Sequence, residues 1–343
     1  MRQAMNGTVE LNKKRRNATI LITFGMLIMI SFILSMNTGY MKVAPIELFK
    51  TLFGQGTAQQ QLILFDFRLP RIVISVLIGA GLAVSGCIMQ SVSRNALADP
   101  GILGINAGAG LMVMIFVSFF SVTSTGHIFL LPVLAFVGAG LTATLIFILS
   151  YQRNQGISPN SLLLTGIGVA AGISAAMVIL TIRLKPDQYQ FVASWLAGSI
   201  WGTNWKFVIT LLPWILILIP YLMYKSNVLN IISLGEERSI ALGISVQREQ
   251  IKLLIAAVAL AAACVSVSGG IGFVGLIGPH LARRLVGSQH NILLPTAALA
   301  GSLLVIVADM LGRVIMAPAE IATGVVVAVI GAPYFIYLLI KMK

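Results

Sequence analysis

Unbroken apolar stretches of about twenty residues recur along the whole chain, and they constrain its fold more than any other feature. Charged residues make up only 10% of the 343 residues and the mean hydropathy is +0.96, so polar side chains are too few to cover a water-soluble surface. In a bilayer every backbone N–H and C=O group must be paired within the protein. Because a membrane β-barrel would show shorter, alternating segments, these stretches predict an all-α, polytopic membrane protein.

The stretches divide the chain into a basic N-terminus at residues 1–18 and a single transmembrane domain at residues 19–343. The first span follows the basic run 13–16 and lacks a small-residue cleavage site, so we interpret it as a retained helix rather than a signal peptide. The eighth span is short and rich in Gly and Pro, which predicts a partly broken segment surrounded by protein or water. The ten predicted spans are 19–36, 71–92, 101–121, 127–150, 160–182, 205–224, 251–270, 272–287, 292–314 and 321–341.

The distribution of Lys and Arg favours one orientation of these spans. With the N-terminus inside the cell, 15 of the 23 basic residues fall on the cytoplasmic side, so both termini are predicted to be cytoplasmic. The basic residues left outside include Arg68, Arg71 and Arg313. This external excess of positive charge requires an explanation of its own.

Two connections are long enough to have a function. The external segment 37–70 contains a predicted short helix at 43–50, with Pro45 in its first turn. The cytoplasmic segment 225–250 has glycines on both sides of a short amphipathic stretch, which predicts a helix, a turn and a second helix. It is interpreted either as a solvated loop or as a docking surface for a cytoplasmic partner.

Motifs for hydrolysis are missing from the sequence. We find no Walker-type phosphate loop, no metal-spaced His and Cys cluster and no nucleophile elbow, so the chain is expected to hydrolyse nothing by itself. Asp309 precedes Arg313 by four residues, and we favour a local ion pair near the membrane surface over a transport role. Cys87 and Cys264 are interpreted as packing residues, although a disulfide stays open. A surface or capping role is expected for the three histidines, which lie at predicted helix ends or in loops: His127, His280 and His290.

Several polar motifs, in order along most of the chain, resemble the bacterial iron-siderophore and cobalamin ABC importer permease family (FecCD-type). Ala96 and Ala322 stand where the family pattern usually has Pro, and neither replacement removes a charge. The motifs are Phe67-Arg68-Leu69-Pro70-Arg71, the glycines from Gly79 to Gly86, Gln90, Arg94-Asn95-Ala96-Leu97-Ala98-Asp99-Pro100, Gly104, Trp195-Leu196-Ala197-Gly198-Ser199, Leu234-Gly235, Leu242-Gly243, the run from Gly269 to His280, Asp309 with Arg313, and Gly331-Ala332-Pro333-Tyr334-Phe335.

The resemblance implies the type II ABC importer permease fold and a set of partners. These are a second permease subunit, either the same or a sister chain, two copies of a cytoplasmic ABC ATPase, and an extracytoplasmic substrate-binding protein. The chain itself would bind no cofactor, because ATP is used by the partner ATPase. The resemblance assigns binding-protein docking to Arg68, Arg71 and Arg313. It assigns ATPase coupling to Leu234, Gly235, Glu236, Glu237, Arg238, Ala241, Leu242 and Gly243.

The translocation path is assigned by the same analogy to small side chains on the fifth span: Ser161, Thr165, Gly168 and Gly172. Small residues at this spacing more often mark close packing of helices, and we favour packing for them. Gly79, Gly81 and Gly86 on the second span are interpreted as packing positions for the same reason.

The sequence thus predicts the permease subunit of an ABC importer in the bacterial cytoplasmic membrane, with a ferric siderophore as cargo. A cobalamin or haem importer is the nearest alternative. An ion-coupled secondary transporter would need carboxylates near the midplane, which the predicted spans lack. A structural membrane scaffold would leave the charged cytoplasmic segment and the external arginines without a role.

Overall fold

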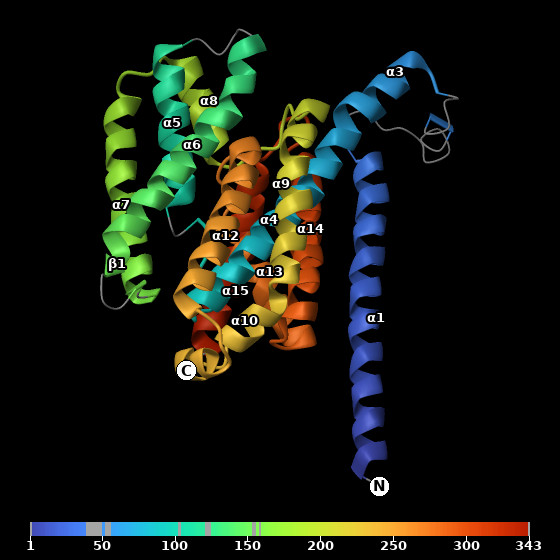
Figure 1. The fold of residues 1–343 in the computed structure, drawn as a ribbon. Coiled ribbons are helices and arrows are strands. Elements are labelled where there is room, and N and C mark those ends of the chain that lie inside the picture. Colours follow the sequence, from blue (N-terminus) through green and yellow to red (C-terminus); the bar gives the residue numbers. More distant parts are fainter. Residues whose placement is uncertain are drawn as a thin grey trace.

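The computed structural model describes residues 2–38, 50–51, 56–101, 104–120, 125–152, 156–157 and 159–341, and helices dominate it (Figure 1). A short antiparallel hairpin joins two of the helices. The elements are α1 (Arg2–Asn37), α3 (Ala58–Gln61), the π-helix η1 (Leu62–Arg68), α4 (Leu69–Ser93), α5 (Ile105–Phe119), α6 (Thr125–Ser150), β1 (Tyr151–Gln152), β2 (Gly156–Ile157), α7 (Pro159–Thr181), α8 (Pro186–Leu196), α9 (Trp205–Tyr224), α10 (Ser226–Ile232), α11 (Glu236–Ala241), α12 (Val246–Ser268), α13 (Val274–Val286), α14 (His290–Ile315) and α15 (Thr323–Lys341).

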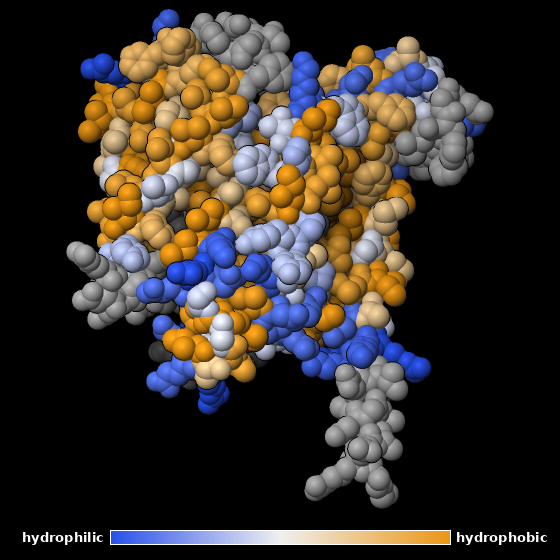
Figure 2. Space-filling model, in the orientation of Figure 1, coloured by the Kyte–Doolittle hydropathy of each residue, from blue (hydrophilic) through white to orange (hydrophobic). Residues whose placement is uncertain are grey.

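A helix occupies each of the ten predicted spans, which confirms the all-α membrane fold. Within the described residues, seven helical segments are long and apolar enough to cross a membrane, and α5 and α15 are shorter apolar helices. Figure 2 shows hydrophobic side chains over most of the visible face, with hydrophilic ones gathered at the end where α10 lies. The seven segments are 13–37, 58–93, 130–150, 161–181, 205–224, 246–268 and 290–315.

The second span begins earlier than the sequence predicts. Residues 58–68, assigned to an external connection, are helical and continue directly into α4. A capping box starts this extension, because Thr57 and Gln60 each bond the backbone N–H of the other with their side chains. The turns widen into η1 just before Pro70, which has no N–H to donate to an α-helical bond. The predicted short helix at 43–50 lies almost entirely outside the described residues.

Helix α4 runs through the middle of the bundle and packs against α9, α12, α13 and α14. Glycines allow this close approach, since a Cβ atom at Gly79 would collide with the carbonyl of Gly301 and one at Gly86 with the carbonyl of Gly275. A Cβ atom at Gly81 would meet the sulfur of Cys264. The packing role predicted for these glycines is therefore confirmed, and both cysteines are free thiols buried in the bundle.

The Gly-rich run 269–273 between α12 and α13 is non-helical. The eighth predicted span, 272–287, is instead a continuous helix from 274 to 286, so the prediction that this span is broken is wrong. Gly269 has a φ of +69°, and a Cβ atom there would collide with the carbonyl of Trp195. Gly324 N–H also donates a 2.8 Å hydrogen bond to Gly198 O across the same region. Protein therefore surrounds this irregular backbone, the condition under which it is tolerated at membrane depth.

Candidate functional site

A buried carboxylate, that of Asp309, organises the charged residues at one end of the bundle. Nε and Nη2 of Arg71 each lie 2.9 Å from Asp309 Oδ1, and Arg313 Nε lies 3.2 Å from Oδ2. Thr323 Oγ1 donates to Asp309 Oδ1 at 3.3 Å. Arg71 Nη1 also pairs with Glu320 Oε2 at 2.8 Å. The local pair between Asp309 and Arg313 is confirmed, whereas the partners Arg71 and Glu320, which come from distant parts of the sequence, were not predicted.

Two of the three predicted docking arginines tie α1 to the bundle. Arg68 is 7% exposed and bonds the carbonyl of Met36, and Arg313 is 6% exposed. Nη1 of Arg313 donates to Ser35 O at 3.2 Å and to Thr38 O at 3.0 Å. The carbonyls at the end of a helix have no partners within that helix and carry partial negative charge, so they suit a guanidinium group. Arg68 and Arg313 are therefore largely buried by contacts within this chain, which the distribution of basic residues did not predict.

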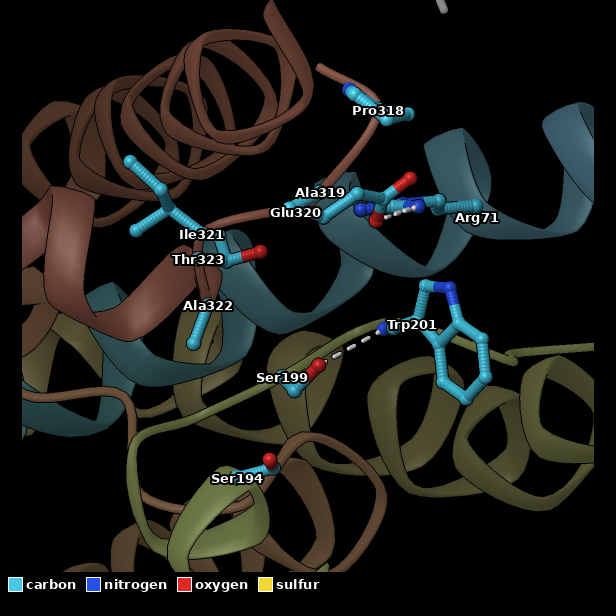
Figure 3. A pocket seen from close by; sticks show the side chains of 10 residues that line it. All are labelled: Arg71, Ser194, Ser199, Trp201, Pro318, Ala319, Glu320, Ile321, Ala322 and Thr323. Atoms are coloured by element: carbon cyan, nitrogen blue, oxygen red, sulfur yellow. Dashed lines mark hydrogen bonds and ion pairs between the residues drawn. The ribbon is translucent and has the colours of Figure 1, made fainter. Parts of the chain in front are cut away.

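Arg71 differs from these two because it borders an open pocket of about 380 Å³. Figure 3 shows its guanidinium group paired with Glu320 on the segment between α14 and α15. On another wall of the pocket, the backbone N–H of Trp201 donates to Ser199 Oγ at 3.2 Å. The docking role of the three arginines stays a prediction, and among them only Arg71 lines this pocket.

The opposite end of the bundle presents the predicted helix, turn and helix as α10 and α11. Gly235 between them has a φ of +110° and a ψ of 158°, a conformation almost restricted to glycine. Gly243 after α11 has a φ of +81°. Ser239 Oγ bonds Ile231 O at 2.8 Å and Gly235 O at 2.6 Å, which fixes α11 against α10.

The surface of α11 is exposed and mixes apolar and charged side chains. Leu234 is 50% exposed, and Ile240 and Leu242 are each 60% exposed. Contiguous exposed apolar groups rimmed by charge are typical of a docking surface. All the predicted coupling residues lie on this surface, with Gly235 half-buried at its base, and their coupling role stays a prediction: Leu234, Gly235, Glu236, Glu237, Arg238, Ala241, Leu242 and Gly243.

A polar network around the buried His290 joins α10 to the rest of the bundle. Asn230 Oδ1 accepts the backbone N–H of His290 at 2.8 Å and lies 2.9 Å from its ring Nδ1. His290 Nε2 lies 2.7 Å from Ser91 Oγ at the end of α4. Asn230 Nδ2 donates to Asn291 at 2.7 Å, and Asn291 Nδ2 donates to Asn227 at 3.1 Å. His290, the first residue of α14, is only 3% exposed, so a surface role is wrong, and the side chain of Asn230 accepts its backbone N–H.

An ion pair fastens the same end to α12. Lys225 Nζ lies 2.7 Å from Glu249 Oε2, and Lys252 Nζ lies 3.1 Å from Oε1. The hydrogen bond with Glu249 raises the pKa of Lys225 above its ordinary value. Because Lys225 stands at the junction of α9 and α10, this pair fixes where α10 leaves the bundle.

The candidate path residues lie on α7, the least buried of the predicted spans. Ser161 and Thr165 are half-buried. A Cβ atom at Gly168 or Gly172 would meet nothing within 4 Å, so the structure does not pack these glycines against another described helix of this chain. Close packing within the chain is therefore wrong for Gly168 and Gly172, and the path role stays a prediction.

A second acidic residue, Asp99, also lies inside the bundle. The connection between α4 and α5 folds back, so Asp99 is 5% exposed and accepts a 3.4 Å hydrogen bond from Gly101 N–H. A Cβ atom at Gly275 would lie 3.1 Å from both Asp99 Oδ1 and Leu82 O. Asp99 lies between two predicted spans, and nothing in the local sequence pattern predicts its burial.

The bundle and its two charged ends define a multi-pass membrane permease subunit. The FecCD transport family model matches residues 27–341, and the chain belongs to this family.

Two bacterial relatives and one solved structure illustrate the relationship. The iron(3+)-hydroxamate import system permease protein FhuG of Bacillus subtilis (strain 168) is 49% identical over 93% of this chain and 96% of its own length. The iron-uptake system permease protein FeuC of the same organism is 42% identical over 92% of this chain and 96% of its own length. A metal-chelate type ABC transporter in an inward-facing conformation matches with a TM-score of 0.82 and 30% identity, covering 94% of this chain and 99% of that one.

These similarities establish the class of function. The chain is a permease subunit of an ABC importer in the cytoplasmic membrane and not an enzyme. Membership of the family implies a partner ATPase and a second permease subunit.

Proposed function

We propose that this chain carries a ferric siderophore across the cytoplasmic membrane, with hydroxamate chelates as the first class to test. The observation that supports this cargo most directly is the 49% identity to an iron(3+)-hydroxamate import permease over nearly the full length of both chains. The chelate is the cargo and not a resident cofactor. ATP is used by the partner ATPase.

We further propose the complete assembly and its orientation. Each permease subunit binds one of the two ATPase copies through the surface of α11, a substrate-binding protein docks over the pocket beside Arg71, and both termini are cytoplasmic. The exposed apolar side chains of α11 and the distribution of basic residues support this arrangement. The arginine end is then the outer end of the bundle, and the α10–α11 end is the inner end.

The path is proposed to run beside α7. This helix exposes large apolar side chains, with Leu164 71% and Ile167 53% exposed. The open face around Gly168 and Gly172 leaves room for the second permease subunit, the same or a sister chain, to approach closely. Ser161 and Thr165 would supply hydroxyl groups along that interface.

Uptake measurements in cells that lack this gene test the cargo. Radiolabelled iron is offered separately as hydroxamate, catecholate and citrate chelates, with labelled cobalamin and haem as controls. We expect uptake of the hydroxamate chelate to be lost and to return with the wild-type gene. Loss confined to cobalamin or haem would overturn the proposed cargo.

Coupling to the ATPase is tested at Gly235. The change Gly235→Val places a β-branched residue in a conformation that costs roughly 1–3 kcal/mol, so α11 should shift or fray. We expect ATP hydrolysis to continue in the reconstituted transporter while uptake falls. Gly140→Val is the matched control, because a Cβ atom there meets nothing within 4 Å. Normal uptake by the Gly235 variant would refute the coupling role.

A further inference from the structure

The side of α1 that faces the bundle ends in two basic residues. Ile20 packs against the main core, Phe24 is 7% exposed and Asn17 is 6% exposed, so these residues mark the stripe of α1 turned towards the other helices. Continuing that stripe towards the N-terminus at helical spacing reaches Lys13 and Arg16, which lie three residues apart on one face. Both are therefore directed towards the foot of the bundle.

Lys13 and Arg16 line an open hollow of about 540 Å³. The other walls are the turn between α13 and α14 and the last part of α10. None of the lining residues is acidic, and in the part of the chain that the structure describes no ion pair or hydrogen bond engages the side chain of Lys13 or Arg16. The lining residues are Lys13, Arg16, Asn230, Ser233, Val286, Gly287, Ser288 and Gln289.

The rest of the hollow favours an anion as well. Gly287 turns the chain with a φ of +86°, and α14 begins three residues later. Gln289, the residue at its N-cap, makes no side-chain capping bond, and Asn230 Oδ1 accepts the N–H of His290. The N-terminus of a helix of this length carries partial positive charge that adds to the two cations. Ser288 places a hydroxyl group on the rim that can donate to a phosphate oxygen, whereas the hydroxyl of Ser233 already donates to Asn230 O at 2.6 Å.

The position of the hollow indicates where the anion comes from. Figure 1 places α1 at the edge of the bundle, and α1 packs mainly against α14. The flank of α1 that continues from Arg16 at helical spacing is apolar and open, with Leu27 41% and Leu34 50% exposed. An acyl chain can lie along that face while its phosphate reaches the hollow at the foot of α1. A basic hollow between membrane helices on the cytoplasmic side suits an anionic lipid headgroup.

We infer that the hollow between α1, α10 and the α13–α14 turn binds the phosphodiester headgroup of an anionic glycerophospholipid. Because α10 carries Asn230 and Ser233 to one wall, the bound lipid braces α1 against the helix that leads into α11. The site is independent of the cargo and of the ATP-driven cycle.

The test measures lipid retained by the purified permease–ATPase complex. Native mass spectrometry counts bound phosphatidylglycerol in the wild type, in the double variant Lys13→Gln/Arg16→Gln, and in the matched double variant Lys14→Gln/Arg15→Gln. The two double variants lose the same charge from the same helical turn, but the second loses it from the other side of α1. We expect phosphatidylglycerol affinity to fall roughly 10- to 30-fold in the first variant and less than about threefold in the second.

A third variant leaves α1 unchanged. Ser288→Asp adds a negative charge to the opposite wall and is expected to weaken phosphatidylglycerol binding by about tenfold. Equal losses of phosphatidylglycerol affinity in both α1 variants, or no loss of affinity in any variant, would overturn the proposed lipid site. Displacement of the lipid by millimolar inorganic phosphate would identify a free-anion site instead. Loss of the ATPase from Lys13→Gln/Arg16→Gln with lipid binding unchanged would assign the hollow to the protein partner.

Discussion

The two ends of the bundle use their polar residues in opposite ways. At the proposed outer end, Arg71, Asp309 and Arg313 form a buried ionic cluster whose partners all lie within the chain. At the proposed inner end, half-buried and exposed neutral amides surround the buried His290, and the charged residues of α11 face outwards. Buried ions make a structure sensitive to the loss of a single partner, whereas exposed charges remain available to another protein. The ionic cluster thus fixes the positions of the helices at the outer end, whereas the exposed charges of α11 leave the inner end able to bind another protein.

The largest effect is expected from Asp309→Asn at the outer end. This change leaves Arg71 with Glu320 alone and Arg313 without a carboxylate, and loss of one partner from a buried ionic cluster typically destabilises by about 3–5 kcal/mol. The midpoint of thermal unfolding in detergent measures the effect. Asp187→Asn, the same chemical change at an exposed position in the first turn of α8, serves as the control. Equal midpoints for the two variants would contradict the buried cluster.

A smaller effect is expected from Asn230→Ala at the inner end. The change removes the acceptor of the His290 backbone N–H and the neighbour of its ring Nδ1, and an unsatisfied buried donor costs roughly 1–3 kcal/mol. Hydrogen exchange at the start of α14, followed by mass spectrometry, should show faster opening. Asn227→Ala, an exposed residue at the end of the same ladder, should change stability by less than about 0.5 kcal/mol. Equal rates of hydrogen exchange at the start of α14 in the two variants would show that Asn230 does not hold α10 in place.

The smallest effect is expected from Glu320→Gln. Glu320 is 31% exposed, and Asp309 still neutralises Arg71 after the change, so stability should fall by less than about 1 kcal/mol. Removal of this carboxylate should instead free Arg71 Nη1 for an acidic residue of the binding protein and strengthen docking, with a gain that shrinks as salt rises. The equilibrium affinity of the permease for the substrate-binding protein, measured at low and at high salt, tests this gain. Weaker docking at low salt would show that Glu320 itself holds the pocket in its docking form.

Local features could be predicted because their causes are local. The spans follow from apolar stretches long enough to cross a bilayer, and the Asp309–Arg313 pair follows from a spacing of four residues on one helix. The turn at Gly235 follows from a residue type that tolerates its backbone conformation. The positive-inside count also treated Arg68 and Arg313 as external cations, but the count contains nothing about burial.

Sequence alone determined that this is an all-α membrane protein and where most of its helices lie, because the bilayer imposes its length and hydrogen-bonding rules on each segment separately. The family followed from the order of polar motifs along the chain, and the family model that matches residues 27–341 agrees with it. Tertiary structure decided which arginines are buried and what they contact. Arg71 and Asp309 are 238 positions apart, and Asn230 and His290 are 60 apart. Such contacts depend on how α4, α10 and α14 pack, and that packing is set by the fit of side chains and glycines across helix interfaces rather than by the periodicity within any one helix.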